Sequence, residues 1–123
     1  MQNNTSFINN QVIKMIFNMH RFHILFIKSF PGARTNEINH YVLPTLIEEN
    51  PDAVVIHAGT NNIRSKRGQP EEQNERIAED IMQIGRTCRQ RGVNEVFISA
   101  ITCRRNKDEM KKVKEINGIV KDM

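Results

Sequence analysis

Four histidines are the side chains of this sequence best suited to acid–base or metal chemistry. His57 closes a short apolar run and could serve as a general base, although a histidine inside a buried strand is more often a packed, neutral side chain. His20, His23 and His40 have no cysteine or carboxylate partner at ligand spacing. We therefore expect no metal site and no cofactor.

The cysteines and the charges indicate no specific partner. Cys88 and Cys103 form no Cys-x-x-Cys pair, so we expect reduced thiols. Eighteen Lys and Arg against fourteen Asp and Glu give a net charge of +4, but residues 1–35 hold no acid and residues 36–80 carry a net −5. The basic residues of 104–114 could contact phosphates, yet they are typical of a solvated helix face. We expect no nucleic-acid partner.

In the first half of the chain, the spacing of apolar residues predicts strand, helix and strand. Residues 23–30 form a β-branched and aromatic run before a Pro-Gly turn, and residues 53–57 are apolar without alternation, as in a strand buried on both faces. Between them, Thr35 is expected to cap a helix that Pro44 kinks or restarts and that ends at Asn50. Its predicted core face is Ile38, Val42 and Leu46.

The second half repeats the alternation. Pro70 is expected to open a helix that stops at Gly92, and residues 96–101 read as a second buried strand. Asn106 and Glu109 form a capping box for a last helix. The predicted core faces of these two helices are Ile77, Ile81, Ile84 and Cys88, and Val113, Ile116 and Val120.

This alternation predicts right-handed crossovers and an α/β fold, a three-layer α/β/α sandwich around a parallel sheet. We divide the chain into a poorly determined segment, 1–22, and a domain, 23–123. Sites in such sheets form beyond the carboxyl ends of the strands. The loops at 29–35 and 57–63 are therefore the candidate site.

The sequences of these two loops, SFPGART and, with the strand before it, PDAVVIHAGTNNI, resemble blocks II and III of the SGNH (GDSL-type) hydrolases. The resemblance covers about residues 24–122 and implies a flavodoxin-like sheet and an acyl-ester hydrolase. It also implies that Gly32 and Asn61 donate hydrogen bonds to the oxyanion of the reaction. Taken without the resemblance, both loops suit ordinary turns that end a strand.

Other family motifs are missing from the sequence. There is no Gly-Asp-Ser motif, and neither Ser6 nor Ser29 stands in a turn that follows a strand. No Asp-x-x-His follows, and Asn62 replaces the aspartate usual after the block III asparagine. We therefore expect a truncated or degenerate relative without nucleophile or base, and hence without turnover. One alternative is an ester hydrolase whose missing catalytic residues come from a longer transcript or a partner chain. The other is a non-catalytic module that binds a small acyl or anionic ligand or a protein.

The N-terminal part bears on sheet completeness and on location. The apolar stretch 12–30 is interrupted by charges, so we expect no membrane span, no secretory leader and a cytoplasmic protein. Residues 12–17 could supply the central first strand of a flavodoxin-like sheet. Otherwise the strands at 23–30 and 53–57 must pair directly, and unpaired sheet edges would favour oligomers.

Overall fold

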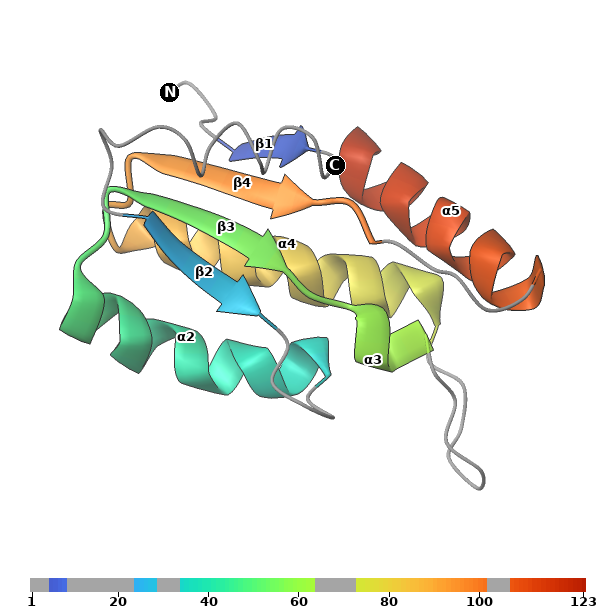
Figure 1. Cartoon of the computed structure of the whole chain (residues 1–123), viewed down its shortest axis with the longest axis horizontal. Coiled ribbons are helices and arrows are strands. Elements are labelled where there is room, and N and C mark those ends of the chain that lie inside the picture. The colour runs from blue at the N-terminus through green and yellow to red at the C-terminus, as the bar shows by residue number, and fades with distance from the viewer. Residues whose placement is uncertain (1–4, 9–23, 29–33, 64–72, 102–106) are drawn as a thin grey trace.

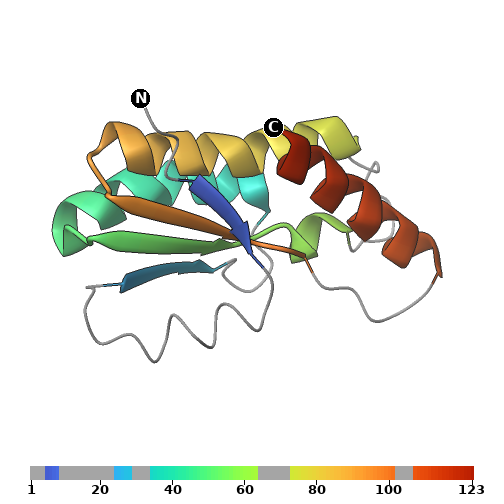
Figure 2. The ribbon, with the colours of Figure 1, turned by 90° about the horizontal axis from the view of Figure 1, so that it is seen from above.

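The computed structural model describes residues 5–8, 24–28, 34–63, 73–101 and 107–123 (Figure 1). Its elements are β1 (Thr5–Ile8), β2 (Ile24–Lys28), α2 (Thr35–Glu49), β3 (Ala53–His57), α3 (Thr60–Ile63), α4 (Asn74–Gln90), β4 (Glu95–Ser99) and α5 (Lys107–Asp122). Four parallel strands form one sheet in the order β1-β4-β3-β2. Figure 2 shows α2 and α4 over one face of this sheet, with α5 beside α4. The predicted α/β class with a parallel sheet is confirmed.

The strand order follows the second of the two arrangements considered from the sequence and adds one strand. β2 pairs directly with β3, from Ile24 opposite Ala53 to Lys28 opposite His57. The segment 12–17, one of the two alternatives for the position between these strands, lies outside the described residues. β1 pairs with β4 at the opposite edge of the sheet. The sequence pattern did not indicate β1.

β3 is buried on both faces, as its continuous apolar sequence predicts. Ala53, Val54, Val55 and Ile56 are each at most 1% exposed. Because side chains alternate along a strand, Val54 and Ile56 face the helices and the other two face the opposite side of the sheet. A strand with no polar face cannot lie at a solvated surface, so β3 occupies an interior position of the sheet.

The main core lies between the sheet and the helices, and it contains every core position predicted for α2, α4 and α5. α4 packs against the sheet at Gly85, where a Cβ would meet methyl groups of Ile56, Val96 and Ile98 at 3.8–3.9 Å. Each fully buried aliphatic side chain stabilises the fold by about 1.5–3 kcal/mol. Burial of these three helix faces therefore fixes the helices on the sheet.

The beginnings of two helices correct the sequence predictions. The N-cap of α2 is Arg34, whose N–H donates to Glu37 Oε1 at 3.2 Å, and Thr35 is already the first helical residue. The expected cap was wrong because the Thr35 side chain is used in a buried contact described below. α4 begins at Asn74 and not at Pro70, since Gln73 has the extended backbone of an N-cap residue.

The other helix boundaries follow local chemistry. α2 continues through Pro44 without restarting and ends at Asn50, whose left-handed backbone (φ 44°) closes the last turn. α4 ends at Gln90 and is closed by Gly92, which is also left-handed; Gly92 N–H donates to Arg89 O and Val93 N–H to Cys88 O. This pair of hydrogen bonds is a Schellman motif, so the predicted glycine stop is confirmed.

Candidate functional site

The candidate site is the edge of the sheet where the parallel strands end. β2, β3 and β4 finish at Lys28, His57 and Ser99, and the short helix α3 follows β3 directly (Figure 1). The helix α2 begins at the same edge, because the chain turns back along the sheet after β2. Both loops expected from the sequence, 29–35 and 57–63, therefore leave the sheet on this edge.

The turn between β3 and α3 requires a glycine. Gly59 has φ +105°, a conformation that L side chains rarely adopt, and its carbonyl accepts a hydrogen bond from Asn62 N–H at 3.1 Å. A Cβ at this position would lie 2.7 Å from Ile101 Cδ1, which comes from the chain after β4. Gly59 thus brings α3 against the end of the neighbouring strand.

A reciprocal pair of hydrogen bonds ties this turn to the start of α2. Thr35 N–H donates to Asn62 Oδ1 at 3.0 Å, and Asn62 Nδ2 donates to Thr35 Oγ1 at 3.0 Å. Both residues are buried, with exposures of 0% for Thr35 and 3% for Asn62. Since Thr35 N–H is one of the orphan donors at a helix start, Asn62 satisfies it from a segment 27 residues away.

α4 completes this polar cluster. Thr35 Oγ1 donates to Asp80 Oδ2 at 3.2 Å, so the hydroxyl both accepts and donates. Asn39 Nδ2 donates to Asp80 O at 3.1 Å and to Thr35 O at 3.3 Å. We call Thr35, Asn39, Asn62 and Asp80 the edge cluster. It joins α2, α3 and α4 at the carboxyl edge.

The structure locates the predicted oxyanion donors only in part. Asn61 lies in α3, one residue before Asn62, but its side chain is outside the described part of the chain. Gly32 lies outside the described residues altogether. The structure does bring together the segments next to them, because Thr35 and Asn62 are in direct contact. Sequence reasoning noted Asn62 only as a departure from the family pattern and missed its role as a link.

A second polar contact joins the ends of β3 and β4. His57 Nδ1 lies 3.1 Å from Ser99 Oγ, and which atom donates depends on the histidine tautomer. Ser99 Oγ is also placed to donate to Ala100 O at 3.4 Å. A hydroxyl beside an imidazole has the geometry of a nucleophile and its base. Ser99 is only 2% exposed, however, so this contact gives an ester carbonyl no approach to the hydroxyl.

Two asparagines hold α5 at the same edge. Asn117 pairs with the backbone of Ile101 as a neighbouring strand would, accepting from its N–H at 2.9 Å and donating to its carbonyl at 3.0 Å. Asn74, the first residue of α4, donates to Glu115 Oε2 at 2.5 Å. The chain that leaves β4 is thereby fixed to α5.

Thiol and metal chemistry find no support in the described residues. Cys88 is a free thiol on the buried face of α4. Burial raises its pKa to about 12, so it is a poor nucleophile at neutral pH. Cys103 lies outside the described residues. Within the described ranges, no three His, Cys, Asp or Glu side chains gather closely enough to hold a metal ion. None of the described helices has the length and apolar character that a bilayer crossing requires.

A scan against protein-family models finds no match for this chain, and searches of the curated proteins and of the solved structures find none either.

Proposed function

We propose that this chain is a relative of the SGNH hydrolases in which the carboxyl edge of the sheet holds a small acyl or anionic ligand without hydrolysing an ester. The observation that carries the proposal is the Thr35–Asn62 pair, which joins the two segments whose sequences resemble blocks II and III. A preorganised site needs its donors on segments that cannot move apart. The edge cluster supplies that rigidity.

The absence of turnover follows from the side chains that the sequence and the structure offer. An ester hydrolase of this type needs a serine with a base within hydrogen-bond reach and open to substrate. In the described part of the chain, Ser99 with His57 is the serine–histidine contact found, and its hydroxyl is buried. Gly32 and Asn61 would then serve as ligand donors rather than as parts of a complete triad.

The proposal also covers the layers and the strand order of the fold. We propose a three-layer α/β/α sandwich with a flavodoxin-like sheet, on the support of β3 and β4 as adjacent parallel strands connected by α4. The described helices cover one face of the sheet, so the third layer is part of the proposal (Figure 2). The cytoplasmic location expected from the sequence is likewise a proposal.

The test combines a reactive probe with a binding probe on the same folded sample. A fluorophosphonate serine probe, read by intact mass, should give no adduct. Sodium butyrate, titrated against 15N-labelled protein, should shift the amide resonances of residues 57–63 saturably. Asn61→Ala should weaken this binding at least several-fold, whereas Gln90→Ala removes an exposed amide from the far end of α4 and should not.

Each alternative result overturns a stated part of the proposal. An adduct mapped to Ser99 would make the His57–Ser99 contact a working nucleophile and base. An adduct on any other serine that is lost in Asn61→Ala would show that the chain has an activated nucleophile and is a working ester hydrolase. Absence of any saturable shift would exclude an acyl-carboxylate site and leave the protein-binding alternative.

A further inference from the structure

Two helices carry the exposed large apolar side chains of the described residues. On α2 these are Tyr41, Leu43 and Ile47, with exposures of 59%, 45% and 55%, and at α5 they are Met110 and Met123, at 38% and 49%. α2 lies along the β2 edge of the sheet and α5 lies on the β1 side (Figure 1). The molecule therefore presents exposed apolar side chains on two helices at opposite sides of the sheet. On α2 they do not share one face, because at 100° per residue Leu43 and Ile47 lie on the opposite flank of the buried stripe from Tyr41. The two exposed faces of interest are the Tyr41 flank of α2 and the side of α5 that faces away from the core.

The charges on these two faces are opposite. α2 contains Glu37, Glu48 and Glu49, all exposed, and no lysine or arginine. On α5, at 100° per residue, four exposed lysines fall within a sector of about 80° on the side away from the core. We call these the lysine row: Lys107, Lys111, Lys114 and Lys121.

Acidic residues next to the lysine row favour a protein partner over a nucleic acid. Asp108, Glu115 and Asp122 each follow a lysine of the row and lie beside it on the helix surface. Together with Glu109 they offset four of the five lysines of α5 and leave it a net charge of only about +1, which is weak attraction for a long polyanion such as nucleic acid. A short partner surface with carboxylates in matching positions fits better.

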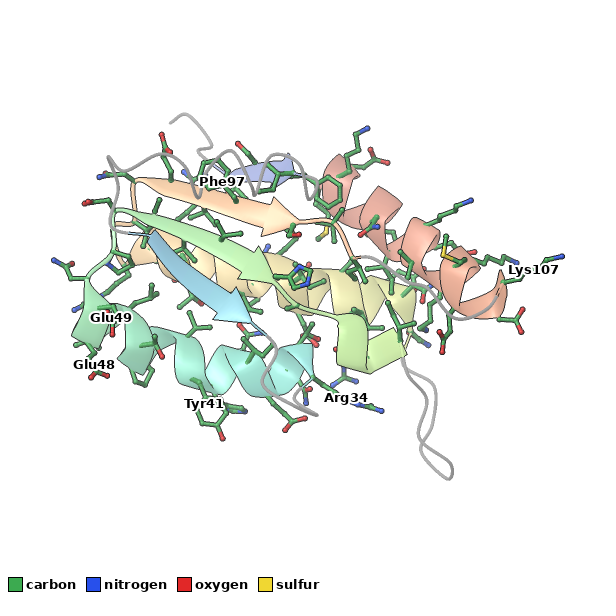
Figure 3. The ribbon with its side chains drawn as sticks, viewed as in Figure 1. Arg34, Tyr41, Glu48, Glu49, Phe97 and Lys107 are labelled. Carbon is green, nitrogen blue, oxygen red and sulfur yellow. The ribbon has the colours of Figure 1, made fainter. Side chains whose placement is uncertain are left out.

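The lysine row also contains a gap of the size of one side chain. Gly118 lies in the row between Lys114 and Lys121, and a Cβ built there meets no atom within 4 Å. On the other face, Tyr41 projects outward from the middle of α2 (Figure 3). A protruding ring on one helix and a gap on the other are complementary shapes.

We propose that α2 of one copy packs antiparallel against α5 of a second copy, with Tyr41 seated over Gly118. In this register Glu48 lies opposite Lys111, because each is seven residues, about 10.5 Å, from the central contact. Glu37 comes beside Lys121 at the other end. The Tyr41 ring also lies next to lysine ammonium groups, a favourable cation–π arrangement.

The two faces are different, so the contact is heterologous. After one contact forms, one copy keeps its α5 face free and the other copy keeps its α2 face free, so association proceeds head to tail. Exposed ion pairs contribute little, so burial of the Tyr41 ring supplies most of the affinity while the charges set the register. Leu43 and Ile47 lie on the other flank of α2 and stay outside this contact. Self-association should therefore be weak, concentration-dependent and weakened several-fold by 0.5 M salt.

Filling the gap is the most direct test. Sedimentation velocity over a concentration series should show the mean mass of the wild-type protein rising with concentration. Gly118→Leu should reduce association at least tenfold, and Tyr41→Ala should do the same by removing the ring. Gly118→Leu meets no neighbouring atom and replaces a glycine inside a helix, so circular dichroism and Tm should show a fold at least as stable as the wild type.

A charge exchange tests the register. Glu48→Lys and Lys111→Glu should each weaken self-association, and an equimolar mixture of the two variants should recover concentration-dependent association in which the two variants alternate. Arg91→Glu, at the exposed end of α4, is the matched control for Lys111→Glu. Both lower the net charge from +4 to +2 and so reduce general repulsion, which means that a loss confined to Lys111→Glu reports the specific contact.

Three results would overturn the proposal. The first is a wild-type protein that stays monomeric at about 1 mM. The second is association that Gly118→Leu and Tyr41→Ala leave unchanged, which would place the contact elsewhere, for example on a strand edge. The third is failure of the mixed charge variants to associate although each single variant has lost self-association, which would exclude the α2–α5 register.

Discussion

The helix-covered face of the sheet and its carboxyl edge are built on different principles. The face is closed by aliphatic side chains such as Ile56 and Ile84, both fully buried. The edge is closed by polar pairs such as Thr35–Asn62 and Asn117–Ile101. Apolar packing is non-directional and tolerates small shifts, whereas each polar pair needs one partner at one distance. The face provides stability, and the edge fixes the positions of the loops.

The largest effect is expected on the face. Ile84→Ala removes a side chain with 0% exposure from α4 and should lower the free energy of unfolding by about 2–5 kcal/mol. Urea denaturation measures this change. Its neighbour offers a control: Gly85→Ala places a Cβ at ordinary contact distance and should be neutral or slightly stabilising. A small loss in Ile84→Ala would mean that α4 does not pack closely on the sheet. A large loss in Gly85→Ala would mean that the added Cβ has less room than the 3.8–3.9 Å contacts allow.

The sequence was informative for the face and not for the edge, and the reason is physical. The spacing of Ile77, Ile81 and Ile84 identifies a helix face because burial follows the helical period. The polar link of Thr35 with Asn62 has no period, since it joins residues 27 positions apart. The sequence thus predicted the core positions and the α/β class, but it assigned Thr35 to a local cap.

The same limit applies to the strands and to the candidate donors. β1 has only four residues, with Thr5 and Ser6 among them, too short and polar for its pattern to be recognised. Gly32 and Asn61 were predicted from a resemblance of loop sequences, and the structure supports only the proximity of their neighbours. His57 was expected to be packed and neutral, but its contact with Ser99 depends on strand order, which local patterning does not determine.

At the edge, Asn62→Ala should give the next largest loss, about 1–3 kcal/mol of unfolding free energy. It leaves the buried Thr35 N–H and the Thr35 hydroxyl without the Asn62 side chain. Urea denaturation measures the change in the free energy of unfolding. The butyrate titration shows whether the positions of the loops change as well. Thr35→Ser keeps every polar atom of the pair and serves as the control. Unchanged stability in Asn62→Ala would show that the edge cluster does not join the loops.

A smaller and more local effect is expected at α5. Asn117→Ala removes the side chain that pairs with both backbone groups of Ile101, at a cost of about 1–2 kcal/mol. Hydrogen exchange should accelerate at Ile101 N–H, while amides in the centre of β3 stay protected. Equal acceleration at both places would indicate a global loss of stability and would contradict a local role for this clamp.

The smallest effect concerns Cys88, the one described thiol on the helix-covered face, and it depends on pH. Its pKa is raised from 9.0 in the unfolded chain to about 12 by burial, so between these values the unfolded state releases the proton first. Stability is complete below pH 9 and declines above it, by about 1 kcal/mol at pH 10. Cys88→Ala should therefore show a shallower decline than the wild type from pH 9 to 10.5, with Cys103→Ser as the control in both proteins. If the free energy of unfolding falls equally with pH in both proteins, the Cys88 thiol reaches water in the folded state. The helix-covered face would then open as readily as the carboxyl edge.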